Sequence, residues 1–137
     1  MSQEDLPGMS RWTLSVEEAE AWLDEVVDEI PEALLRGLNG GIVFSEAVQP
    51  SPHGAGLYTL GQYFCEPMGL GRYIVLYYGS FVRVYGQRPP SVQKKELRKL
   101  LLHELTHHVE SLAGVRDLEW KDEEFLRQYR GQNHETD

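Results

Sequence analysis

Cysteine is almost absent from this sequence, since Cys65 is the only one among 137 residues. An internal disulfide is therefore excluded, and a lone thiol is typical of a reducing compartment, so we expect the protein in the cytoplasm. Long apolar runs are also missing, because none approaches the roughly 20 residues that a membrane-spanning helix needs. The polar, acidic residues 1–10 do not resemble a secretory signal.

Basic residues are scarce as well, with 13 lysines and arginines against 22 acidic residues and a net charge of −9. A chain this acidic is repelled by phosphate, so we expect neither nucleic acid nor an anionic membrane as its partner. The length suits a single hydrophobic core. We therefore predict a flexible lead over residues 1–11, one domain over 12–130 and a polar tail over 131–137.

Helical periodicity marks the first third of the chain. Ser15 and Glu18 have the spacing of a capping box, so we expect a helix from residue 16 to about residue 29. Pro31 disfavours helix at the residue before it and predicts a short second helix through Leu35.

The middle of the chain is rich in residues with high β-propensity. Its three strand candidates are Ile42–Phe44, Leu57–Phe64 and Arg72–Tyr78. Residues 81–85 fit either a strand or a helical turn.

The longest helical pattern covers residues 91–113, with Ser91 as its expected cap and Gly114 as its expected end. Asp117 is placed to cap a last helix over residues 118–129. The order of the expected elements is helices, then strands, then helices. This order indicates an α+β fold rather than alternating βαβ units.

The long helix carries His103-Glu104-Leu105-Thr106-His107, which matches the pattern H-E-x-x-H. Imidazoles four residues apart lie one turn apart on one helix face, so both can bind a single Zn²⁺ ion. Glu104 lies about 100° further round the helix, where it can accept a proton from a water molecule that zinc acidifies. The pattern therefore predicts metal-dependent hydrolysis. The alternative is a pair of solvated histidines on an amphipathic helix.

A catalytic zinc site also needs a third protein ligand and an open position. The residue six positions after His107 is Ala113, which cannot bind a metal, and we expect a carboxylate at Glu110 to point away from the shared ion. Acidic residues further along the chain remain as candidates: Asp117, Glu119, Glu123 and Glu124. Each has a simpler interpretation as a helix cap or as part of a solvated acidic face.

Two neighbouring residues have more ordinary expected roles. His108 lies nearer the apolar stripe of the helix, so we expect it to pack or to support the ligands rather than to bind metal. Cys65 follows Phe64, and we expect it to be a small buried residue.

Four stretches of the chain match one family. They are Glu29-Ile30-Pro31-Glu32-Ala33-Leu34-Leu35, Gly56-Leu57-Tyr58-Thr59-Leu60-Gly61, Ile74-Val75-Leu76-Tyr77-Tyr78-Gly79-Ser80-Phe81 and Leu101-Leu102-His103-Glu104-Leu105-Thr106-His107-His108. In them the sequence resembles the small bacterial zincin-like metallopeptidases, or mini-zincins. The resemblance implies a minimal zincin-like α+β domain, in which a small mixed β-sheet packs on the active-site helix beside an N-terminal helix and a short C-terminal helix. It also implies that the sheet edge binds an extended peptide by strand addition.

The family motif looks like H-E-x-x-H-x-x-G-x-x-D, whose aspartate is the third metal ligand. Here Gly114 and Asp117 form the G-x-x-D four residues later, which is about one helical turn. The resemblance maps the third ligand to Asp117, with Glu119 as the alternative, and suggests Tyr129 as a supporting residue. A tyrosine packed on a helix is the simpler interpretation of Tyr129.

Two hypotheses follow. The first is a cytoplasmic zinc metallopeptidase acting on peptides or proteins, with Glu104 as the catalytic base and His103, His107 and Asp117 as ligands. The second is a catalytically inactive, zincin-derived module that binds metal or another protein. The displaced third ligand favours the second, as does a chain too short for a deep cleft.

Overall fold

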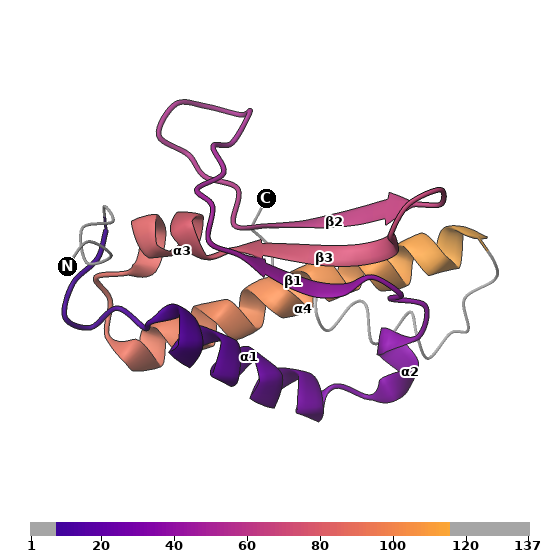
Figure 1. Cartoon of the computed structure of the whole chain (residues 1–137), viewed down its shortest axis with the longest axis horizontal. Helices are drawn as coiled ribbons and strands as arrows, with labels where there is room; N and C mark the ends of the chain where they lie inside the picture. The colour runs from indigo at the N-terminus through magenta and orange to yellow at the C-terminus, as the bar shows by residue number, and fades with distance from the viewer. Residues whose placement is uncertain (1–7, 116–137) are drawn as a thin grey trace.

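The computed structural model describes residues 8–115, and its strands and helices have the mixed composition of an α+β domain, as predicted (Figure 1). The helices are α1 (Val16–Glu29), α2 (Glu32–Leu35), α3 (Tyr78–Tyr85) and α4 (Pro90–Val115). The strands are β1 (Gly41–Ser45), β2 (Gly61–Glu66) and β3 (Gly71–Tyr77). The predicted helix over residues 118–129 lies outside the described residues.

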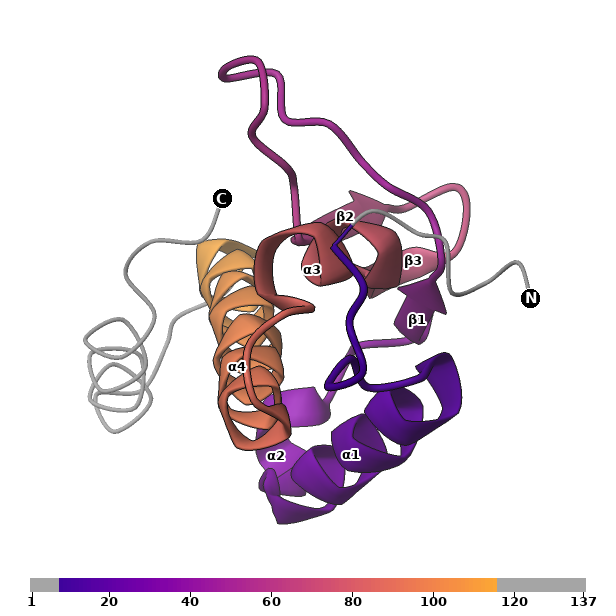
Figure 2. The same cartoon turned by 90° about the vertical axis from the view of Figure 1, so that its left-hand side faces the viewer.

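The three-stranded sheet has the order β1-β3-β2, with β1 parallel and β2 antiparallel to β3. Helices α1, α2 and α4 all lie on one side of it (Figures 1 and 2). Alternation along β3 directs Ile74 and Leu76 toward these helices, where both are fully buried. The sheet is therefore mixed and packs on the long helix, as expected, and β2 is the edge strand that lies along α4.

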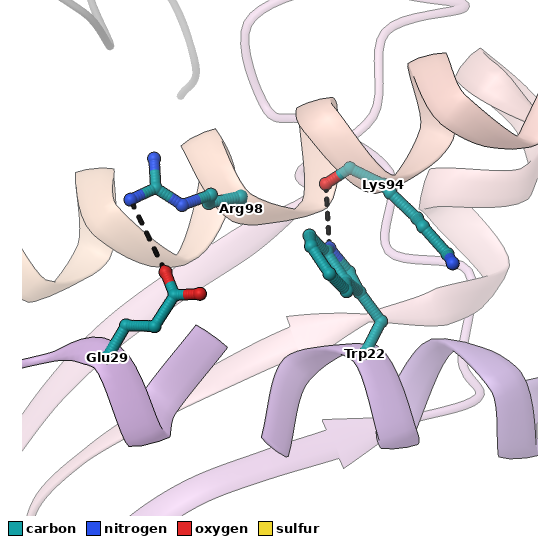
Figure 3. A network of polar contacts seen from close by, with 4 residues as sticks. All are labelled: Trp22, Glu29, Lys94 and Arg98. Atoms are coloured by element: carbon teal, nitrogen blue, oxygen red, sulfur yellow. Dashed lines mark hydrogen bonds and ion pairs between the residues drawn. The ribbon is translucent and has the colours of Figure 1, made fainter. Parts of the chain in front are cut away.

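Helix α1 begins where the sequence predicts, because Ser15 and Glu18 form a reciprocal capping box. Its buried residues Ala19, Leu23 and Val26 recur at helical spacing and face the core. The contact with α4 is polar at its rim, as Figure 3 shows: Trp22 Nε1 donates to the Lys94 carbonyl at 2.8 Å, and Arg98 lies 3.8 Å from Glu29. That ion pair is exposed and contributes about 1 kcal/mol at most.

Residues 12–14 are attached to α4 through one buried side chain. Gln93 accepts from the Leu14 N–H at 3.1 Å and donates to the carbonyls of Trp12 and Arg88 at 3.0 and 2.8 Å. Gln93 is only 1% exposed, so these bonds satisfy an amide that would otherwise be costly to bury.

The predicted start of the second strand was wrong. Strand β2 begins at Gly61 rather than at residue 57, because Tyr58 instead pairs with Pro50 in a separate bridge. Residues 81–85, left open between two structures, belong to helix α3.

The long helix also differs from its predicted bounds at both ends. It begins at Pro90, so Ser91 lies inside the helix and does not cap it. Proline suits a first turn because its missing N–H has no partner there. The helix continues through Gly114 to Val115, so Gly114 does not end it.

Candidate active site

The two motif histidines lie one turn apart on α4 with their rings close together. The ring centroids of His103 and His107 are 4.7 Å apart and the ring planes meet at 85°, and both residues are partly exposed. Two imidazoles bound to one tetrahedral zinc at about 2.0–2.1 Å have centroids about 5 Å apart. The separation of the two rings is therefore compatible with a shared zinc ion.

Glu104 lies on a different face of the helix from the histidines, and it is fully buried. Strand β2 passes directly over it at Gly61. A Cβ atom on Gly61 would lie 3.2 Å from Glu104 Cγ and 3.0 Å from Leu76 Cδ2, which is closer than ordinary contact. Glycine at this position lets the edge strand approach the motif helix at the predicted catalytic carboxylate.

His108 of α4 is fully buried, in agreement with the packing or supporting role expected from the sequence. Its Nε2 lies 2.8 Å from the Arg36 carbonyl, which can only accept, so Nε2 carries the proton. Burial lowers the pKa of the His108 imidazole, although the bond to Arg36 opposes that shift. Neutral Nδ1 then accepts a hydrogen bond from the Tyr63 hydroxyl at 2.9 Å.

Arg72 on β3 completes this network. Its Nη1 donates to the Tyr63 hydroxyl oxygen at 3.1 Å and also to Ser111 Oγ. The network joins β2, β3 and α4, and through Arg36 it also joins the end of α2. It fixes the rotation of α4 about its own axis, and that rotation sets the direction in which the motif histidines point.

A shallow hollow of about 650 Å³ opens between β2 and α4. It is lined by Gln62, Tyr63, Cys65, Glu104, His107, Glu110 and Ser111. The expectation of a buried Cys65 was wrong: the residue is exposed near the end of the edge strand β2. Glu104, the predicted catalytic carboxylate, and His107, a predicted ligand, therefore both line this hollow.

The third metal ligand remains a prediction. Asp117, Glu119 and Tyr129 all lie outside residues 8–115. Within that range no group of three or more His, Cys, Asp or Glu side chains is arranged to hold one ion. Glu110 Oε1 lies 3.8 Å from His107 Nδ1, so the two side chains are neighbours on the helix but too far apart for a hydrogen bond.

The supporting residues were missed by sequence reasoning. The strand alternation in Gly61-Gln62-Tyr63-Phe64-Cys65 places Tyr63 on the same face as Gly61, but nothing local shows that this face meets the motif helix. Arg72 and Ser111 are 39 residues apart in the chain, and only the fold brings them together.

The fold and the site define an α+β domain with an H-E-x-x-H helix beneath the edge strand of a small mixed sheet. No family model and no curated protein matches the chain. A solved structure, described as a conserved hypothetical protein from Thermus thermophilus, does match, at 35% identity and a TM-score of 0.65. The match covers 74% of this chain and 100% of that chain, so the chain belongs to the same family as that protein. None of the helices in residues 8–115 is long and apolar enough to cross a bilayer.

Proposed function

We propose that this protein is a zinc-dependent metallopeptidase that hydrolyses peptide bonds. The observation that carries the proposal is the pair of histidine rings, 4.7 Å apart, beside a fully buried Glu104 at the wall of an open hollow. A divalent ion held by His103 and His107 would supply Lewis acidity there. The lone Cys65 supports a place in the reducing cytoplasm.

The residues of the hollow have distinct proposed roles. Glu104 accepts the proton of the attacking water and passes it to the leaving amine. Its burial limits solvent competition for that proton and strengthens its interactions with charge in the hollow. The Tyr63–His108 hydrogen bond holds the motif helix against the edge strand. Asp117, or Glu119, would complete the metal ligands.

The second candidate function is a metal-binding or protein-interaction module without activity. It is supported by the displaced G-x-x-D at Gly114–Asp117 and by the shallowness of the hollow. A fourth protein ligand that closes the metal site would favour this function, because catalytic zinc keeps one position open.

The test combines metal analysis with one isosteric substitution. The purified chain should bind close to one zinc ion, and Glu104→Gln should keep that ion while peptide hydrolysis falls by about 10²–10⁴-fold. Glu96→Gln is the matched control, since Glu96 lies on the same helix in a surface pair with Lys99. It should keep both metal and turnover.

His107→Ala tests the ligand role separately, and it should lower zinc affinity by at least about tenfold. Hydrolysis that survives in Glu104→Gln would refute the proposed mechanism. Zinc binding without any hydrolysis in the unmodified protein would instead select the inactive module.

A further inference from the structure

Strand β2, at the edge of the sheet, has backbone groups that point away from β3 along the hollow. The Tyr77 N–H donates to the Leu60 carbonyl at 2.8 Å, and opposed residues in an antiparallel pair alternate between exchanging and not exchanging hydrogen bonds. The residues whose backbone groups point away from β3 are therefore Gly61, Tyr63 and Cys65. Within residues 8–115 no strand pairs with that edge of β2. An extended peptide can bind there as an added strand.

A second hollow, of about 670 Å³, continues from the first along the same strand. The two share Gln62 as a common wall, and the second extends back along the chain to Leu60 and the loop that precedes it. Gln62 and Leu60 are two residues apart, which is about 7 Å along a strand. A peptide on the edge of β2 would therefore reach both hollows within about two of its own residues.

Part of the wall of the second hollow is apolar, and Ser51, His53, Tyr58, Thr59 and Gln62 line the rest of it. Leu57 from the loop and Val84 from α3 are 54% and 44% exposed, and both line this hollow together with Tyr85. Exposed apolar side chains that converge from separate segments mark a candidate binding surface. Of the described residues that line it, none is acidic, whereas Glu104 and Glu110 line the first.

We propose that the hollow formed by Leu57, Leu60, Val84 and Tyr85 is a specificity subsite, which binds an aliphatic or aromatic side chain of an extended peptide paired with the free edge of β2. The inference rests on the proposed peptidase function, and it names the substrate class. An apolar side chain leaves water on entering this hollow, while the peptide backbone pairs with Gly61 and Tyr63. A charged side chain that packed against Leu57, Leu60 and Val84 would lose hydration without gaining a hydrogen bond from these side chains.

The test measures binding rather than turnover. The probes are pairs of blocked heptapeptides, one pair for each position, and the two members of a pair differ only by leucine or asparagine at that position. Their binding to full-length protein carrying Glu104→Gln is measured by fluorescence anisotropy. One position should show a preference for leucine of about tenfold or more. Amide NMR signals of Gly61 and Tyr63 should shift with both peptides of that pair, and those of Leu57 and Val84 mainly with the leucine peptide.

Val84→Asp should abolish the leucine preference. Val43→Asp is the matched control, because Val43 is similarly exposed, at 40%, on strand β1. It should leave the preference unchanged. Equal affinities for every peptide pair, or a preference that survives Val84→Asp, would overturn the subsite.

The two proposals fail in distinguishable ways. If the unmodified protein hydrolyses peptides with no side-chain preference, the subsite is wrong and the peptidase function stands. If Glu104→Gln binds leucine peptides selectively but the unmodified protein hydrolyses none, the peptidase function is wrong and the apolar subsite stands as a peptide-binding site.

Discussion

The hydroxyl of Tyr63 on the edge strand lies 2.9 Å from Nδ1 of His108 on the motif helix. This bond joins the two elements between which the candidate active site opens. Because His108 directly follows His107 in the chain, a backbone movement at His108 would also move a predicted metal ligand.

Tyr63→Phe removes the donor of that bond and leaves Nδ1 of a buried imidazole without its partner. We expect a loss of about 1–3 kcal/mol in the free energy of unfolding, measured by urea denaturation. Tyr73→Phe is the control, because the Tyr73 hydroxyl donates to Glu66 at an exposed site. Its effect should stay within about 0.5 kcal/mol. Equal effects of the two substitutions would contradict the structural role of Tyr63.

His108 should make stability depend on pH. Burial lowers its pKa in the folded state, so below about pH 6.5 the unfolded chain binds more protons than the folded one. The contribution is fully present above the unfolded pKa, and it is lost as the pH falls toward the folded value.

His108→Gln should therefore flatten the stability profile below pH 6.5 relative to the unmodified protein. Unfolding would be followed in chelator-treated protein, so that metal release does not contribute. His53→Gln, at an exposed loop position, is the control and should leave the slope unchanged. An identical slope in His108→Gln would show that this histidine is not the group that titrates.

Gly61→Ala should disturb the site, because the added methyl group meets Glu104 Cγ at 3.2 Å and Leu76 Cδ2 at 3.0 Å. We expect a loss of about 1–3 kcal/mol of stability from this overpacking. A shift of the Glu104 signals in NMR spectra would locate the strain. Gly114→Ala is the opposite case, since a Cβ there contacts nothing within 4 Å and alanine favours helix. Gly114→Ala should therefore be neutral or stabilising. A similar loss of stability in both variants would argue against the close approach of Gly61 to Glu104 and Leu76.

Gln93→Leu tests how the segment before α1 is held. The substitution removes three hydrogen bonds and leaves the backbone groups of Leu14, Trp12 and Arg88 without them. We expect a loss of about 2–4 kcal/mol, together with faster amide exchange at Leu14. A cost below about 1 kcal/mol would mean that water satisfies these groups equally well.

The sequence predicted the parts of the fold that depend on local chemistry. The capping box at Ser15 and Glu18 begins α1 as expected, and Ile42–Phe44 lies within β1. Predictions from local patterns were wrong where tertiary contacts determine the secondary structure. Tyr58 has strong β-propensity but pairs with Pro50 outside the sheet, and Gly114 remains helical despite its preference for helix ends.

The same difference between local and long-range determinants holds for the candidate site. The pattern H-E-x-x-H predicted that His103 and His107 lie close together, because helical spacing alone places them one turn apart. The exposure of Cys65 and the role of Tyr63 follow from the edge position of β2, which depends on strand order. Strand order is a long-range property that no single segment encodes.

The length of α4 constrains how a metal site could be completed. The helix carries the chain eight residues beyond His107 to Val115, a rise of about 12 Å. The two residues from there to Asp117 span at most about 7 Å, so coordination by Asp117 would require the last turns of α4 to unwind. Glu119 has about 7 Å more of chain and needs less unwinding. Zinc addition should then lower the helical signal in circular dichroism if Asp117 is the ligand, and the size of that change would report which residue closes the site.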